Sequence, residues 1–119
     1  MDADFIRDLF AEFGPVDVRR MFSGAGVFAD GLMVALIVRD VLYLKADDAG
    51  AERFAAEGCE QFGYTRKGGR RTVLPYWRMP DRLYDDPVEL AAWARASLAV
   101  ARARKLAPKA GKTRSKKRR

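Results

Sequence analysis

Residues 16–46 read VDVRRMFSGAGVFADGLMVALIVRDVLYLKA, a pattern that predicts consecutive antiparallel strands. Asp30-Gly31 is a strong hairpin signal, because glycine accepts the positive φ of a two-residue turn. Asp40 is a second turn signal between two apolar runs. The run before it is almost entirely apolar, which favours a strand that is buried on both faces or central in the sheet. The expected strands are residues 16–22, a segment beginning at Val27, residues 32–39 and residues 41–46, with a flexible turn at residues 23–26.

The segments on either side of this stretch predict three helices. Residues 2–13 have apolar side chains at helical spacing and are followed by Gly14-Pro15, which ends a helix. A short helix is expected up to Glu57, where Gly58 stops it, and the last helix should run to about Arg104. Short carboxylates stand before each helix and predict its N-terminal cap. These caps are Asp2 or Asp4, Asp47-Asp48, and Asp86, which is followed by Pro87 and by Glu89 in a capping-box pattern.

Two further strands are expected at residues 61–66 and 71–79, joined by a glycine turn. Pro75 lies inside the second, which implies an edge strand or a bulge because proline donates no ladder hydrogen bond. The elements together predict a two-layer α+β fold. Its antiparallel sheet has five to six strands with flanking helices, in the order helix, three or four strands, helix, two strands, helix.

Charge divides the 119 residues into a domain at 1–104 and a basic tail at 105–119 that we expect to be disordered. Residues 102–119 hold ten of the 23 basic residues and no acid. The other 13 basic residues and all 16 acidic residues lie in residues 1–101, which therefore carry a net charge of about −3. A single cysteine, an acidic start and the absence of a long apolar run predict a cytoplasmic protein without a membrane span.

Few residues are suited to catalysis or to metal binding. The sequence contains no histidine, which removes Ser–His and Cys–His nucleophiles and most zinc sites. Glu57 and Glu60 flank Cys59 and should raise the pKa of its thiol, so we expect an ordinary structural cysteine. The glycine-rich residues 23–26 lead into a strand and lack a P-loop ending, so a tight turn with close backbone approach is expected. We therefore expect no catalytic residue, cofactor or metal.

The basic residues are the candidates for binding. Four of them surround the tip of the second hairpin, where they could contact phosphates or form a solvated turn. Tyr64, Tyr76 and Trp77 lie nearby and could stack bases or pack the sheet. The tail could bind nucleic acid weakly and without sequence preference, or could serve solubility alone. The candidate nucleic-acid-binding residues are Arg66, Lys67, Arg70 and Arg71 in the hairpin, and Arg102, Arg104, Lys105, Lys109, Lys112, Arg114, Lys116, Lys117, Arg118 and Arg119 towards the C-terminus.

Several of these segments also share a pattern with one family. The segments that carry this pattern are residues 20–28, 30–31, 33–37, 42–47, 76–81 and 85–94. In this order the chain resembles the N-terminal domain of the TfoX/Sxy family over nearly all of residues 5–100. Ser23 stands where family members often have glycine. Full-length members carry a separate helical C-terminal domain; here a basic tail takes its place, so a stand-alone form is expected.

The resemblance has implications for fold and function. It implies a two-layer α+β fold related to secretion-chaperone-like folds. The founding members regulate natural competence, acting on transcription together with a cyclic-AMP receptor protein. It implies no catalytic or cofactor residue. We therefore expect a non-enzymatic regulatory or protein-interaction domain with a protein partner. The alternative is a protein that binds nucleic acid directly through the 66–71 hairpin and the tail. Its oligomeric state is left open.

Overall fold

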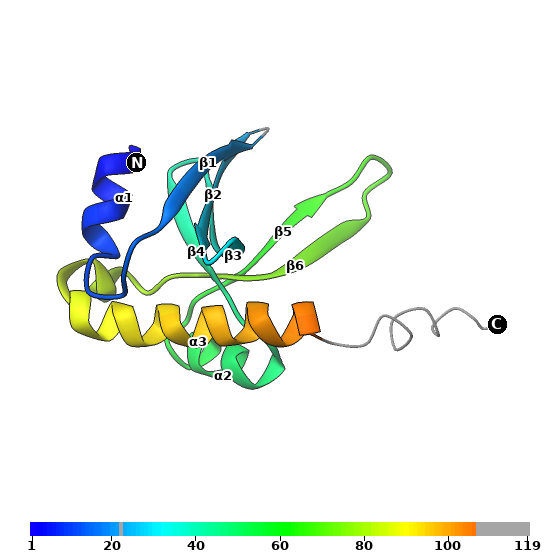
Figure 1. Ribbon diagram of the computed structural model, residues 1–119. Coiled ribbons are helices and arrows are strands. Elements are labelled where there is room, and N and C mark those ends of the chain that lie inside the picture. The colour runs from blue at the N-terminus through cyan, green and yellow to red at the C-terminus, as the bar shows by residue number, and fades with distance from the viewer. Residues whose placement is uncertain (22, 107–119) are drawn as a thin grey trace.

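The computed structural model describes residues 1–21 and 23–106, and within them it has three α-helices, one 3-10 helix and one sheet (Figure 1). This confirms the predicted α+β class. The tail from residue 107 onward lies outside the described residues, as does Phe22 at the end of the first predicted strand. The elements are α1 (Ala3–Leu9), β1 (Asp17–Met21), β2 (Gly24–Ala29), β3 (Leu32–Val38), β4 (Val41–Lys45), α2 (Asp48–Ala56), β5 (Gln61–Thr65), β6 (Arg71–Arg78), η1 (Asp81–Asp85) and α3 (Pro87–Leu106).

The sheet has six antiparallel strands in the order β1-β2-β3-β4-β6-β5. The first four follow one another along the chain as a meander. After α2 the chain returns as the β5–β6 hairpin, of which β6 pairs with β4. Strand β5 is therefore an edge of the sheet, and β1 is the other edge. In Figure 1 the β1–β2 and β5–β6 hairpins extend on the same side of the molecule and diverge towards their tips.

The predicted turns of the meander are present. Asp30 and Gly31 have φ of 53° and 77°, which is the pair of positive values that a type I′ hairpin turn requires. Arg39 and Asp40 also have positive φ, at 52° and 64°, and connect β3 to β4. These two tight turns fix the register of β3 against both of its neighbours.

The flexible turn expected at residues 23–26 is confirmed only at Ser23, and the strand expected from Val27 begins earlier, at Gly24. Gly24 and Gly26 belong to β2 and pair with Val38 and Leu36 of β3. A Cβ atom at Gly24 would lie 1.9 Å from the carbonyl oxygen of Ile37, so only glycine permits this approach of the two backbones. The glycines thus serve strand pairing, and the expected close backbone approach is confirmed.

The core lies between one face of the sheet and the helices. Helix α3 packs on β3 and β4 and buries Leu90, Trp93, Ala94 and Leu98. In Figure 1 it runs along one side of the sheet with α2 beside it, while α1 stands next to β1. Helix α1 ends at Leu9, earlier than predicted, and turns follow up to residue 13, whereas α3 reaches Leu106. Further core side chains come from β2, β3 and β4, from α1 and the residue that follows it, and from α2: Ile6, Phe10, Val27, Val34, Ala35, Ile37, Leu42, Leu44 and Phe54.

Pro75 marks a bulge, and the edge-strand alternative for it is wrong because β6 lies between β4 and β5. Gln61 pairs with Trp77 but Gly63 pairs with Val73, so the register shifts where the proline stands. The side chain of Gln61 donates a hydrogen bond to the Leu74 carbonyl at 2.9 Å and bridges the interruption.

A charged network joins α2, η1 and α3. Arg82 donates hydrogen bonds to Glu57 at 2.6 and 2.9 Å and to Glu89 at 2.7 and 2.8 Å. The Glu89 carboxylate also accepts from the Trp93 indole at 3.1 Å. The N-cap at Asp86 is confirmed, because its side chain accepts from the Glu89 backbone at 3.1 Å. The reciprocal hydrogen bond of the capping box, from the Asp86 N–H to the Glu89 carboxylate, is replaced. The Asp86 N–H donates to the Leu83 carbonyl, and the Glu89 carboxylate accepts from Arg82.

This network predicts an acid-sensitive contribution to stability. Hydrogen bonds from Arg82, and then from Trp93, lower the pKa of Glu89 to about 2. The folded-state pKa therefore lies below the unfolded value of about 4.3, and the carboxylate stabilises the fold fully above about pH 5. This stabilisation is lost as the pH falls towards 2. We expect Glu89→Gln to lower the urea midpoint at pH 7 and to flatten its acid dependence, measured by circular dichroism.

Glu52→Gln is the matched control, because Glu52 is exposed on α2 and forms no ion pair within the described part of the chain. It should keep the acid dependence of the unmodified chain. An unchanged acid dependence in Glu89→Gln would contradict the assignment.

Candidate functional site

The four predicted cations of the β5–β6 hairpin do not share one face. The Arg66 N–H donates to the Arg70 carbonyl at 2.6 Å, which continues the ladder beyond the Tyr64–Thr72 pair. Side chains alternate along a strand, so Arg66 and Arg70 belong to the face that carries Tyr64. Lys67 lies in the turn itself.

Arg71 belongs to the opposite face of the hairpin. A Cβ atom at Gly63 would lie 2.7 Å from the Arg71 guanidinium, so this side chain covers the glycine. Because glycine has no side chain, the Arg71 guanidinium can lie directly against Gly63. The structure therefore brings two of the four candidates together on one face and separates them from the third.

The other described candidates lie near the end of α3. Arg102 forms an ion pair with Asp30, and Lys105 is exposed. Arg104 lines a small cavity with Gln61 and Trp77 at the base of the β5–β6 hairpin, away from its tip. The structure thus separates this cluster from Arg66 and Arg70. Candidates outside the described residues are Lys109, Lys112, Arg114, Lys116, Lys117, Arg118 and Arg119.

Of the three candidate stacking aromatics, Tyr64 is open to solvent, with 44% of its surface exposed. Tyr76 is 6% exposed, and burial raises the pKa of its hydroxyl to about 12. Trp77 stacks on Phe54 with ring centroids 6.2 Å apart. Tyr76 and Trp77 therefore pack the sheet, and Tyr64 is the aromatic available to a ligand.

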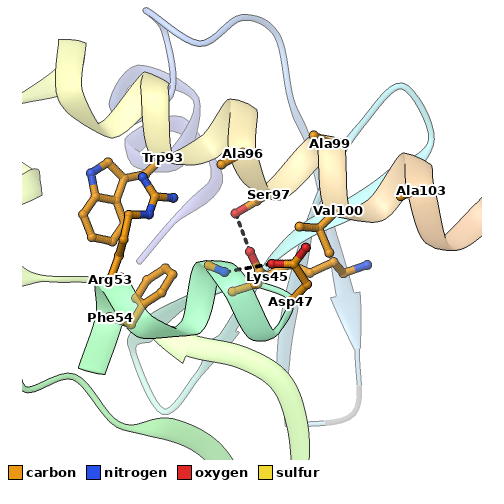
Figure 2. Close-up of a pocket in the computed structure, with 12 residues that line it drawn as sticks. Lys45, Asp47, Arg53, Phe54, Trp93, Ala96, Ser97, Ala99, Val100 and Ala103 are labelled. Carbon is orange, nitrogen blue, oxygen red and sulfur yellow. Dashed lines mark hydrogen bonds between the residues drawn. The ribbon is translucent and has the colours of Figure 1, made fainter. Parts of the chain in front are cut away.

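A cavity of about 260 Å³ lies between β4, α2 and α3 (Figure 2). Its polar groups serve the fold. The Ser97 hydroxyl donates to the Lys45 carbonyl at 2.8 Å, and Asp47 accepts from the Gly50 N–H at 2.8 Å as the cap of α2. Arg53 lies over the Trp93 ring at 4.6 Å. Burial, and then the charge of Arg104, lower the pKa of Lys45. Its ammonium lies 5.4 Å from the Tyr76 ring centroid.

The surroundings of Cys59 and of the two helix-capping aspartates also fit structural roles. Burial raises the pKa of the Cys59 thiol, and Glu57 adds to the effect, in the direction that the sequence predicts. Asp47 caps α2 and Asp86 caps α3, as expected. Among the described residues no three His, Cys, Asp or Glu side chains converge as a metal site. None of the helices described is long and apolar enough to cross a bilayer.

An apolar groove of about 420 Å³ was not located by sequence reasoning. It lies between the end of the β1–β2 hairpin and strand β5. Apolar side chains from five strands dominate its lining, and Arg39 is the one charged residue among the described residues that line it. We call it the sheet-face groove. Its lining residues are Met21, Ser23, Gly24, Ala25, Leu36, Val38, Arg39, Phe62, Gly63, Tyr64 and Leu74.

The groove opens on the sheet face that α3 leaves uncovered. Ala35 and Ile37 belong to the core cluster beneath α3, whereas Leu36, which alternates with them, lies outside that cluster. Phe62 of β5 contacts Tyr43 of β4 edge to face, with ring centroids 5.0 Å apart, and so reaches across the intervening strand β6. One signal in the sequence was available: β3 is apolar on both faces, which requires a second apolar surface beyond the one that packs on α3.

Because the side chains at the rim of the groove are partly exposed, we expect that they can be substituted without loss of the fold. Met21 and Tyr64 are 39% and 44% exposed, so Met21→Ser/Tyr64→Ser should lower the free energy of unfolding by about 1 kcal/mol or less. Phe54→Ala, in the core, should cost about 3–5 kcal/mol. Urea unfolding measures both. Fluorescence of the dye anilinonaphthalene sulfonate should rise with the unmodified chain and fall in the double variant. Equal fluorescence in the two would contradict an open apolar groove.

Comparison with known families agrees with the resemblance in the sequence. Residues 8–101 match the model of the TfoX N-terminal domain. The matched span starts within α1 and ends within α3, so it contains the whole sheet and the sheet-face groove. Comparison with curated proteins gave no match. The chain therefore belongs to the TfoX N-terminal domain family.

Proposed function

We propose that this chain is a non-enzymatic protein-interaction domain of the TfoX family, acting in the cytoplasm in transcriptional regulation. The sheet-face groove is the observation that carries the proposal. An open apolar depression rimmed by polar side chains is typical of a surface that binds another molecule. Here it lies on the sheet face opposite α3, which none of the helices within residues 1–21 and 23–106 covers.

The chemistry of the other cavities supports a binding role. In the cavity of Figure 2, Ser97 and Asp47 are engaged with the backbone, and the raised pKa of Cys59 opposes nucleophilic use of its thiol. The regulatory part of the proposal comes from the family. Its founding members act on transcription with a cyclic-AMP receptor protein, so the partner is inferred to be a protein of that process. The basic C-terminal residues add weak contact with nucleic acid.

The second candidate function is direct nucleic-acid binding by the domain. It is favoured by one arrangement: Arg66 and Arg70 share a face with the exposed Tyr64, so cations and a stacking ring lie together on a hairpin. Against it, Tyr76 and Trp77 are taken up by packing. Most of the groove lining is aliphatic or glycine, which suits apolar side chains better than flat bases.

A titration of labelled duplex DNA distinguishes the two functions. If about four tail cations contact phosphates, affinity should fall roughly a hundredfold between about 50 and 200 mM salt. Lys109→Gln/Lys112→Gln/Lys116→Gln/Lys117→Gln should remove most of the binding and most of the salt dependence. Arg66→Ala/Arg70→Ala should retain it.

The opposite result, with binding lost in Arg66→Ala/Arg70→Ala and kept in the tail variant, would replace the first function by the second. If the intact chain does not bind DNA at about 50 mM salt, both nucleic-acid roles are wrong, and the proposal is reduced to protein interaction.

A further inference from the structure

We propose that the sheet-face groove binds an acidic, amphipathic segment of a partner protein. The segment places apolar side chains in the groove and carboxylates on the arginines around it. This inference rests on the proposed interaction function and specifies the chemistry of the partner. It is carried by the composition of the groove and by the charges on its face.

The floor of the groove is suited to apolar side chains. Leu36 and Val38 come from β3, and Phe62 and Leu74 come from β5 and β6. A volume of about 420 Å³ lies within the range of pockets that hold a small ligand, so it has room for a few side chains rather than a domain surface. Gly24 keeps a side chain off β2 at this end of the face, which leaves backbone as part of the floor.

The charged residues that the described part of the chain places in the groove and beside Tyr64 on its face are arginines. Arg39 lines it, and Arg66 and Arg70 lie on the same face towards the tip of the β5–β6 hairpin. These three arginines form no salt bridge within residues 1–21 and 23–106. Asp40, which follows Arg39 in the chain, pairs with the N-terminal ammonium.

Charge complementarity therefore selects the partner. Arginine guanidinium groups bind carboxylates through paired hydrogen bonds, and exposed apolar grooves receive the apolar face of an amphipathic peptide. A segment with acids beside Leu, Ile, Met or Phe satisfies both. A basic or uniformly polar segment satisfies neither.

Selection from a library of random peptides displayed on phage, against the full chain, tests this. We expect the selected peptides to combine Asp or Glu with large apolar residues. Their affinity, measured by fluorescence anisotropy, should fall at least about tenfold in Arg66→Glu/Arg70→Glu and in Met21→Ser/Tyr64→Ser, the size of loss expected when anchoring contacts are removed.

The matched control is Arg7→Glu/Arg95→Glu, which changes the net charge equally at exposed positions of α1 and α3. It should change the affinity less than about threefold, because a general attraction of acidic peptides to a basic chain falls off beyond about 10 Å at ordinary salt. Equal losses in the control and the hairpin variant would overturn the groove as the site.

Three other outcomes also contradict the inference. Selected peptides that bind all variants equally would show that the groove is not the site, while the interaction function stands. A selection that enriches no binding peptide would overturn both. Oligothymidylate that displaces the peptides, and that loses affinity in Arg66→Glu/Arg70→Glu but not in the control, would assign the groove to nucleic acid instead.

Discussion

The packing of α3 against β3 and β4 determines most of what this domain can do. The helix buries Leu90, Ala94 and Leu98 on one face of the sheet, and Ser97 joins it to the Lys45 carbonyl of β4. One helix of this size cannot cover both faces, yet β3 is apolar on both. Within the described residues, the side turned away from α3 is therefore left with an apolar surface that β-strand side chains cover only in part.

Much of the fold could be predicted from the sequence, because its signals are local. The turns at Asp30-Gly31 and Asp40 and the caps at Asp47 and Asp86 depend on the chemistry of neighbouring residues, and they were predicted correctly. Gly24 was assigned to a turn because its requirement for glycine comes from Ile37, on another strand. The short helix η1 was missed for a related reason: its ion pairs are made with distant segments.

The candidate site was only partly predictable. The sequence identified the hairpin cations, but register decides their faces, and register depends on the bulge at Pro75 and on the ladder bond between Arg66 and Arg70. The groove combines residues from five strands that are far apart in the sequence. No periodicity of a single segment contains that information, although the double-sided apolar character of β3 indicates that some such surface exists.

The same arginines limit what can occupy the groove. An apolar depression beside the edge strand β5 invites pairing between copies of the chain. Two copies that met through this face would bring Arg39, Arg66 and Arg70 of each against the same cations of the other, and like charges in a desolvated interface are costly. We therefore expect this face to favour an acidic partner over a second copy of the chain. The positive charge that is proposed to select a ligand would then also disfavour self-association through the groove.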